Sequence, residues 1–308
     1  HALNDGLEDA AHPPAVVGEA FKQLTTGRTR PVAIETPWDV FAQRADVDLE
    51  VPMDVPAPPV PDPETIAAAV SLLKDARNPM ITVGGGAVHA GEEVLELAKM
   101  LQAPVSAHRS GRGIVSDESP YGFTCASGYK LWMKTDVLLG IGSRLELEYL
   151  RWMKIPDGLK VIRIDIDPTE MFRLRPAVGI VADAKTGARA LADALSRQIA
   201  KRSSREEEFR TIKAAALEEI RVVQPQMSYL EAIRDVLPRD GFFVEEICQA
   251  GFTSRFGFPV YQPRTFVTGG YQDNVGFGFM TALGVKVANP DKAVVSIAGD
   301  GGFMFGVQ

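Results

Sequence analysis

Cysteine is scarce in this sequence, which contains only Cys125 and Cys248 among its 308 residues. Two cysteines so far apart do not make the disulfide framework that stabilises small secreted proteins. The four histidines are scattered, and no His or Cys spacing of a zinc site is present. These shortages argue against a disulfide scaffold and a zinc site, and they favour a reducing, cytoplasmic compartment.

The sequence also has no excess of basic residues. It contains 33 Lys and Arg and 40 Asp and Glu, which gives a net charge of −7. Nucleic acids and anionic membranes bind basic faces, so we expect neither as a partner. No apolar run is long enough to span a bilayer, and no signal segment opens the chain. The composition, 45% hydrophobic and 24% charged, is that of a globular protein with about two domains.

Proline is concentrated between Glu50 and Pro63, which predicts an extended linker and a domain boundary at residues 49–61. Before it, the patterns predict a helix over Ala15 to Leu24 and a buried strand over Pro31 to Glu35. One helix and one strand are too little for a domain. We therefore interpret residues 1–48 as the close of a domain whose beginning lies before His1.

After the linker, short apolar runs alternate with amphipathic segments over residues 62–200. The amphipathic segment from Glu92 to Gln102 places its apolar residues on one helical face. This alternation predicts a parallel sheet with helices on both faces. The predicted strands are Met80 to Val83, Pro104 to Ser106, Asp136 to Gly142 and Lys160 to Asp167.

A charged stretch from Lys201 to Arg221 has apolar residues at helical spacing and predicts a connecting helix within residues 201–226. Residues 227–308 again alternate, which predicts a second parallel α/β region. Its expected elements are the helix Tyr229 to Leu237, the strand Gly241 to Val244, the helix Phe277 to Ala288 and the strand Ala293 to Ala298. The fold class is therefore α/β, with two parallel-sheet domains.

The motif with the clearest chemical meaning is the turn Gly299-Asp-Gly-Gly, which follows the last predicted strand. Ligands of open parallel sheets bind beyond the carboxyl ends of the strands. Gly299, Gly301 and Gly302 let backbone amides approach an anion, and a helix starting near Phe303 adds its positive end. Asp300 has the hard oxygen that Mg²⁺ prefers. The alternative is a tight turn in which Asp300 only caps the helix.

The surrounding sequence resembles the thiamine-diphosphate-dependent enzymes, especially acetolactate synthase, benzoylformate decarboxylase and other 2-oxo acid decarboxylases and carboligases. The resemblance rests on a glycine loop from Gly269 to Gly284, the turn Asn289-Pro-Asp, the last strand and Gly-Asp-Gly, in that order. Arg30 to Val40 resembles the close of the family's pyrimidine-binding domain. Ile162 to Glu170 resembles its central domain.

The resemblance assigns roles to individual residues. It implies that Asp300 binds Mg²⁺ and that Gly299, Gly301 and Gly302 hold the diphosphate. It implies that Gln249 contacts the cofactor, that Val275, before Gly276, supports its bent shape, and that the Asp273 carbonyl meets its aminopyrimidine ring.

Three positions depart from the family pattern. Val275 is smaller than the usual Met, Leu or Ile. Asp273 and Asn274 replace small residues and are candidates for substrate contact. Cys248 stands where many relatives have glycine, and we expect it to be a small buried filler.

The resemblance implies a thiamine-diphosphate- and Mg²⁺-dependent transferase or lyase that decarboxylates a 2-oxo acid or transfers the resulting two-carbon aldehyde unit. It also implies a homodimer or homotetramer. The family's activating glutamate has no counterpart that we can assign here, and its second metal ligand falls beyond Gln308. We therefore expect the 308 residues alone to bind the cofactor weakly and to leave pyruvate unreacted.

Two other functions stay open. One is a noncatalytic homologue with a role in assembly or regulation, and the other is an NAD-type dehydrogenase. The second is weakened because no Gly-x-Gly-x-x-Gly follows the first strand of either domain.

Three minor motifs have alternatives of their own. The loop Gly84-Gly-Gly resembles a dinucleotide-binding loop, so FAD is a possible ligand of this region. Residues Tyr121 to Gly128, however, lack the Met-Leu-Gly-Met-His-Gly stretch of FAD-binding synthases. We therefore expect no bound FAD. His108 to Gly113 is either a phosphate loop or, as we expect, a surface loop. Asp165 and Asp167 are expected to form a polar strand end rather than a metal pair.

Overall fold

The structure is a computed structural model that describes residues 4–6, 10–49, 55–270 and 272–308. Residues 50–54 of the predicted linker therefore lie outside the described residues. The chain divides into two compact units, an N-terminal unit over residues 1–60 and a main unit over residues 61–308.

The N-terminal unit is small. Its elements are β1 (Asn4–Gly6), α1 (Pro13–Thr25), β2 (Ala33–Glu35) and the 3₁₀ helix η1 (Val40–Ala42), and the two strands pair in parallel. The predicted helix is confirmed, but the prediction of a buried strand over Pro31 to Glu35 is wrong. All three residues of β2 are exposed, and Ile34 keeps 38% of its surface accessible, because β2 belongs to a sheet to which the described residues contribute two strands.

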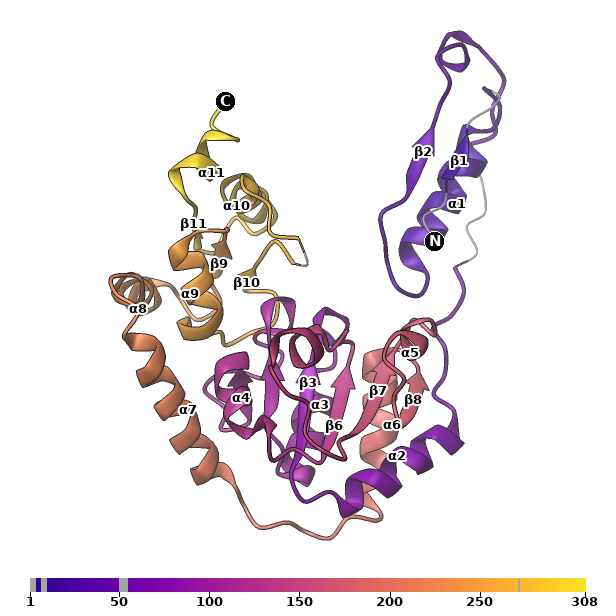
Figure 1. Cartoon of the computed structure of the whole chain (residues 1–308). Helices are drawn as coiled ribbons and strands as arrows, with labels where there is room; N and C mark the ends of the chain where they lie inside the picture. Colours follow the sequence, from indigo (N-terminus) through magenta and orange to yellow (C-terminus); the bar gives the residue numbers. More distant parts are fainter. Residues whose placement is uncertain (1–3, 7–9, 50–54, 271) are drawn as a thin grey trace. The chain divides into compact units, whose positions relative to one another are not determined.

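The first sheet of the main unit, here called the central sheet, has six parallel strands in the order β5-β4-β3-β6-β7-β8. Figure 1 labels β3, β6, β7 and β8 of this sheet. The strands are β3 (Pro79–Val83), β4 (Val105–Ala107), β5 (Gly122–Thr124), β6 (Val137–Ile141), β7 (Lys160–Asp165) and β8 (Val178–Val181).

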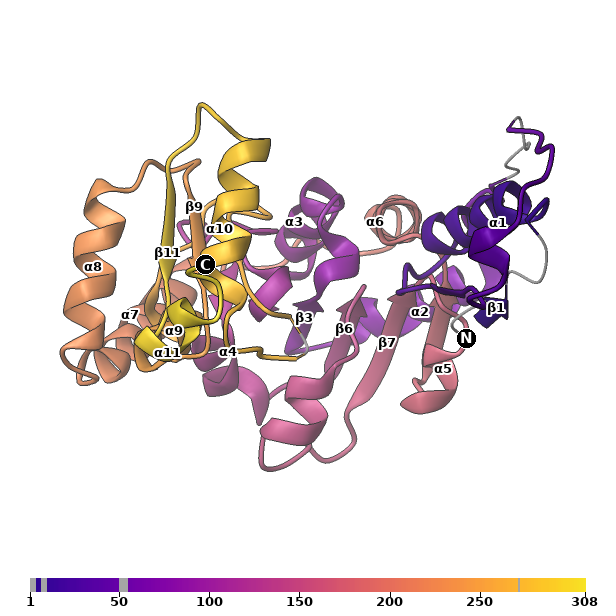
Figure 2. The ribbon, with the colours of Figure 1, turned by 90° about the horizontal axis from the view of Figure 1, so that it is seen from above.

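Helices cover both faces of the central sheet, as the sequence predicts. α3 and α6 lie on one side and α4 on the other (Figure 2). Every residue of β3 and β6 is buried, which is usual for a parallel strand between two helical layers. The covering helices are α2 (Pro63–Asp75), α3 (Gly91–Leu101), α4 (Cys125–Trp132), α5 (Glu170–Arg173) and α6 (Ala184–Ser196).

The helix α7 (Glu206–Arg221) leads to the second sheet, here called the C-terminal sheet. Phe209 and Ala216 on its inner face are buried, as their helical spacing predicts. The helix begins five residues later than the charged stretch.

The C-terminal sheet has three parallel strands in the order β10-β9-β11. The parallel α/β class is therefore confirmed in both sheets. The elements are α8 (Gln226–Val236), β9 (Phe242–Glu245), α9 (Gln249–Gly257), β10 (Phe266–Val267), α10 (Phe277–Ala288), β11 (Val294–Ile297) and α11 (Asp300–Met304).

One helix start differs from its prediction. α11 begins at Asp300 rather than near Phe303, because Gly299 is its N-cap and the Phe303 amide already donates to the Gly299 carbonyl. Within the described residues, no helix is both long and apolar enough to cross a membrane.

Candidate functional site

The candidate site lies at the carboxyl edge of the C-terminal sheet. β9 ends at Glu245, β10 at Val267 and β11 at Ile297, and the strands are parallel, so the segments that follow them meet at one edge. This is the edge at which open parallel sheets bind their ligands. The two glycine motifs of the sequence, around Gly276 and around Asp300, both begin there.

Glu246, the residue after β9, joins these two motifs. Its side chain is buried, and its carboxylate accepts hydrogen bonds from the backbone amides of Gly276 (3.0 Å) and Gly278 (2.6 Å) at the start of α10. A carboxylate suits a helix N-terminus, where amides lack partners and the helix dipole is positive. A Cβ on Gly302 would lie 1.6 Å from Glu246 Oε1. Glu246 therefore occupies the space between α10 and α11.

Gly276 must be glycine for two reasons. Its φ of +92° is strained for any residue with a side chain, and a Cβ there would lie 2.9 Å from Cβ of Phe305. Gly276 thus fixes how the start of α10 approaches α11.

The turn over residues 299–301 is open, in contrast to Gly302. A Cβ on Gly301 would meet no atom within 4 Å, and one on Gly299 would meet only Cβ of Cys248, at 3.9 Å. The Asp300 side chain is exposed, and its Oδ1 accepts a hydrogen bond from the Gly301 amide at 2.8 Å. The turn therefore has uncovered backbone and one accessible carboxylate, which suits a phosphate group with its cation.

Asp300 is not part of a cluster of metal-binding side chains among the described residues. Within the described part of the chain, no group of three or more His, Cys, Asp or Glu side chains could hold a metal ion. A Mg²⁺ ion here would thus take most of its ligands from phosphate and water, an arrangement that Mg²⁺ commonly adopts with nucleotide-type ligands.

Two further predicted residues lie at the start of α9. Gln249 is exposed, and its Oε1 accepts a hydrogen bond from Gln226 Nε2 at 2.6 Å. Cys248 is the N-cap of α9, with its Sγ accepting from the Gly251 amide at 3.3 Å. Cys248 is only half-buried, so the prediction of a buried filler is wrong, because the side chain is used as a cap.

The side chains of Asp273 and Val275 differ in their surroundings. The Asp273 carboxylate is paired with Arg255 (2.8 Å) and Arg109 (2.9 Å). The Val275 side chain is 51% exposed. The structure therefore gives Asp273 protein partners and leaves Val275 accessible.

The segment His108 to Gly113 is not the surface loop that we expected. Gly111, Arg112 and Gly113 are buried, because Arg112 donates hydrogen bonds to the carbonyls of Arg255 and Phe258, both at 2.7 Å. The loop after β4 thus packs against the C-terminal sheet.

His108 and Cys125 lie together, with 3.5 Å between Nδ1 and Sγ, but they are not an activated pair. Burial, helped by the nearby Arg109, Arg255 and Arg112, lowers the pKa of His108 to about 3. Burial also raises the pKa of the Cys125 thiol to about 11. Both groups are uncharged at neutral pH, so Cys125 lacks the thiolate character of a nucleophile.

The glycine loop after β3 has a packing explanation. A Cβ on Gly84 would lie 2.4 Å from the Gly142 carbonyl oxygen, and one on Gly86 would lie 2.9 Å from Gly142 Cα. These glycines let two loops at the carboxyl edge of the central sheet touch, a role that requires no nucleotide.

Asp165 and Asp167 form the polar strand end that we expected. Asp165 Oδ1 accepts from the Asp167 amide at 3.0 Å, and Asp167 Oδ1 accepts from the Thr169 amide and hydroxyl. Their carboxylates therefore bind backbone and hydroxyl groups of the following turn.

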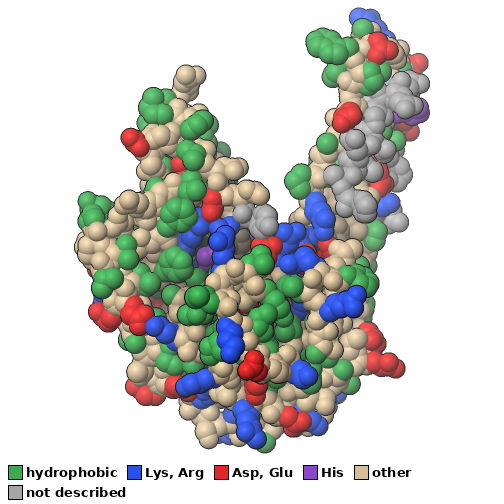
Figure 3. Space-filling model, viewed as in Figure 1, with side chains coloured by type: hydrophobic (Ala, Val, Ile, Leu, Met, Phe, Trp, Pro, Cys, Tyr) green, Lys and Arg blue, Asp and Glu red, His purple; other side chains and the backbone are tan. Residues whose placement is uncertain are grey.

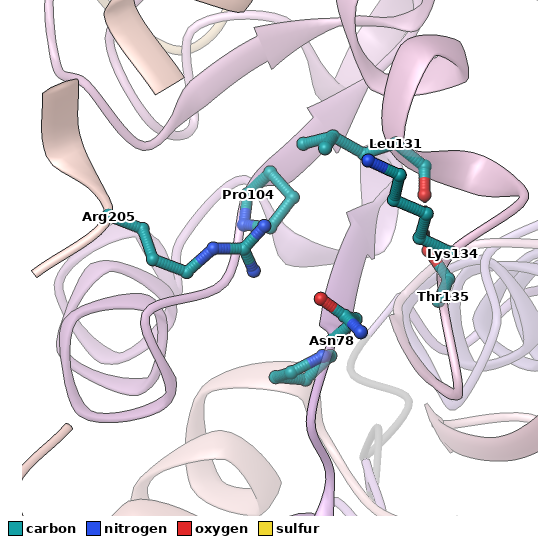
Figure 4. A pocket seen from close by; sticks show the side chains of 7 residues that line it. Asn78, Pro104, Leu131, Lys134, Thr135 and Arg205 are labelled. Carbon is teal, nitrogen blue, oxygen red and sulfur yellow. Dashed lines mark hydrogen bonds between the residues drawn. The ribbon is translucent and has the colours of Figure 1, made fainter. Parts of the chain in front are cut away.

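A small hollow lies at the opposite edge of the central sheet, where β3 and β4 begin. Arg205 and Lys134 approach it from opposite sides (Figure 4). Its remaining lining residues are Asn78, Pro79, Pro104, Leu131 and Thr135. It lies at the amino ends of the strands, which is not where open parallel sheets bind ligands.

Exposed apolar side chains cover much of α10 and α11. Met280 is 51% accessible and Phe305 is 78% accessible. Hydrophobic side chains are visible over these elements in Figure 3.

Glu246, Arg109 and Arg255 are site residues that sequence reasoning missed. The signal for Glu246 was present, because two adjacent glutamates directly follow an apolar strand. No local signal marked Arg109, whose partner Asp273 is 164 residues away.

The sequence matches two described families of domains. Residues 66–191 match "Thiamine pyrophosphate enzyme, central domain", and residues 247–308 match "Thiamine pyrophosphate enzyme, C-terminal TPP binding domain".

Similar proteins include a probable acetolactate synthase large subunit of Methanococcus aeolicus, 30% identical over 99% of this chain and 57% of that protein. A probable 2-ketoarginine decarboxylase of Pseudomonas aeruginosa is 28% identical over 96% of this chain and 54% of that protein. A glyoxylate carboligase of Escherichia coli O157:H7 is 30% identical over 98% and 54%. The chain thus spans little more than half the length of these relatives.

A solved structure shares the fold. The thiamine diphosphate-dependent 4-hydroxybenzoylformate decarboxylase of Rhodococcus jostii RHA1 superposes with a TM-score of 0.76 at 19% identity, over 99% of this chain and 59% of that one.

Proposed function

Because this chain belongs to the thiamine pyrophosphate enzyme family, we propose that it takes part in the decarboxylation or carboligation of a 2-oxo acid with thiamine diphosphate and Mg²⁺. In this proposal residues 62–200 form the central domain and residues 227–308 contribute to the cofactor-binding domain. An acetolactate-synthase-like activity is the specific form that we favour, since large subunits of that enzyme are among the similar proteins.

The observation that carries the proposal is the open turn at Gly299 and Gly301 with Asp300 exposed at its centre. A merely structural turn would not need glycine at position 301, where a Cβ would meet nothing within 4 Å. Unfilled space beside backbone amides at the carboxyl edge of a parallel sheet suits a diphosphate.

Bound thiamine diphosphate would supply the chemistry, namely attack on the keto carbon of the substrate and acceptance of the electron pair released with carbon dioxide. The residues of this chain would bind and orient it. Asp300 would hold Mg²⁺, the amides of the turn would face the diphosphate, and Gln249 would lie beside it. Val275 would contact the cofactor ring through its accessible side chain, and the Asp273 carbonyl would accept from the aminopyrimidine. We assign no residue of this chain to proton transfer.

The substrate class and assembly are part of the proposal. A 2-oxo acid is the substrate class, and a homodimer or homotetramer is the assembly. The exposed apolar side chains of α10 and α11 support an assembly, because an apolar patch of this kind commonly marks a protein contact.

The substitution Asp300→Ala tests the proposal. Calorimetry on the complete gene product should show that the variant binds thiamine diphosphate in the presence of Mg²⁺ at least about tenfold more weakly, because a charge-assisted metal contact is lost. Asp291→Asn is the matched control, since Asp291 is exposed at the other end of β11 and should leave binding unchanged. Equal affinities of wild type and Asp300→Ala would show that Asp300 serves only the turn.

A further inference from the structure

A cluster of four charged side chains links the two sheets of the main unit. Arg109 follows β4 in the central sheet, whereas Glu245, Arg255 and Asp273 belong to the C-terminal sheet and its connections. We call these four residues the Arg109 clamp. Its two cations and two carboxylates balance in charge.

The Asp273 carboxylate is fully occupied inside the clamp. Arg255 donates to both of its oxygens, at 2.8 and 3.1 Å, and Arg109 donates to Oδ2 at 2.9 Å. Arg255 in turn forms hydrogen bonds with both oxygens of Glu245, at 2.9 and 3.2 Å. A carboxylate with three charge-assisted hydrogen bonds has little capacity left for another partner.

Burial makes this cluster costly to break. The side chains of Glu245 and Arg255 are 0% and 5% exposed, and those of Asp273 and Arg109 are 17% and 24% exposed. Removing one member of a buried ion cluster leaves its partner charged and without compensation, which is strongly destabilising. The four side chains therefore hold one another in place.

Arg109 holds the loop before α10 at two points. Besides Asp273, its guanidinium donates to the carbonyl of Gly270. The loop ends at Gly276, three residues after Asp273, and the Gly276 amide is bound by Glu246. Arg109 itself has a φ of +48°, a conformation that arginine rarely adopts and that persists only where its surroundings enforce it.

We propose that Arg109 is a positioning residue of the candidate cofactor site, acting through Asp273 and Gly270 to fix the loop 270–276, and that the Asp273 carboxylate is its internal partner rather than a substrate contact. The identity of the cofactor in this inference rests on the proposed function. The role of Arg109 in fixing the loop does not. A central-domain residue would thereby control the geometry of a site that lies in the other sheet.

The first experiment follows hydrogen exchange of the amides of residues 270–278 in the complete gene product without cofactor. Arg109→Ala should accelerate exchange there about tenfold or more, because the loop loses both anchors. Arg109→Lys, which keeps the charge and can still reach one partner, should show a smaller effect. Arg239→Ala is the matched control, since Arg239 pairs with Glu118 across the same two sheets but on the exposed surface.

The second experiment measures thiamine diphosphate affinity with Mg²⁺ by calorimetry. Arg109→Ala and Asp273→Asn should each weaken binding about tenfold, and the loss in the double variant should be smaller than the product of the two single losses, because both substitutions remove the Arg109–Asp273 interaction. Arg109→Lys should recover part of the loss, whereas Arg239→Ala should bind like wild type.

Two results would overturn the proposal. One is exchange in Arg109→Ala that matches Arg239→Ala, and the other is a double variant whose loss is the product of the two single losses. If wild type binds no thiamine diphosphate but Arg109→Ala still accelerates exchange at residues 270–278, the proposed function fails and the positioning role stands.

Discussion

Glu246 contacts both glycine motifs of the candidate site. Its two carboxylate oxygens accept the amides of Gly276 and Gly278, and one of them occupies the space that a side chain on Gly302 would need. One buried acid thus accounts for the glycine at two positions in two separate motifs, Gly278 and Gly302. A glycine in a ligand-binding motif can therefore be required by a neighbouring side chain that fills the space beside it.

At this scale we predict that Glu246→Gln destabilises the fold and weakens cofactor binding. Glutamine offers one acceptor oxygen and one amino donor, so one of the two glycine amides would face a donor. A buried amide without a partner costs about 1–3 kcal/mol. Urea unfolding of the variant should show this loss, whereas Glu207→Gln, at a side chain that is 89% exposed, should not. An unchanged free energy of unfolding in Glu246→Gln would show that its hydrogen bonds contribute little.

The helix α11 brings together two kinds of glycine. Gly302 is buried against Glu246, whereas Gly301, one residue earlier, faces open space. Adjacent positions on one short helix therefore have different reasons to lack a side chain. At Gly302 the reason is packing against Glu246. At Gly301 the open space fits the cofactor that we propose.

A pair of alanine substitutions separates the two reasons. Gly302→Ala should lower the free energy of unfolding by about 1–3 kcal/mol, because its Cβ has no room beside Glu246. Gly301→Ala should leave stability unchanged or raise it by up to about 1 kcal/mol, since alanine favours a helix. Calorimetry should nevertheless show weaker binding of thiamine diphosphate to Gly301→Ala. Full affinity in that variant would mean that the open space beside Gly301 is not used by the cofactor.

Across the whole main unit, the two sheets are joined by buried charged groups as well as by apolar contacts. Arg112 donates to two carbonyls at the end of helix α9, which follows β9, and pairs with Asp117 at 2.6 Å. His108 lies among Arg109, Arg112 and Arg255, and those cations together with burial hold its pKa well below its usual value. The stability of the main unit should therefore depend on pH.

The direction of this dependence follows from His108. The unfolded chain takes up a proton at His108 near pH 6.5, whereas the folded protein keeps it neutral down to about pH 3. His108 therefore destabilises the fold as pH falls below 6.5, by up to about 1.4 kcal/mol per pH unit. Chemical unfolding between pH 7 and pH 5 should show a smaller loss in His108→Gln than in wild type. The exposed His12 gives the control His12→Gln, and identical slopes in all three proteins would contradict the prediction.

Much of the fold was determined by the sequence alone. Apolar runs of four to seven residues separated by amphipathic segments specify buried parallel strands and covering helices, because burial in both layers requires that pattern. α10 was predicted at the bounds that the structure gives, Phe277–Ala288. The turn at Asp300 was also visible, since a strand that ends in spaced glycines is a local feature.

Only the tertiary structure decided which of these residues act together. Arg109 and Asp273 are 164 positions apart, and Glu246 meets Gly276 across 30 positions, so no local pattern could have paired them. The same holds for burial. Pro31 to Glu35 has the pattern of a buried strand but pairs with a single neighbour, and His108 to Gly113 has the pattern of a surface loop but is covered by the C-terminal sheet. Composition and periodicity determine what a segment can form, whereas its surroundings depend on contacts with segments distant along the chain.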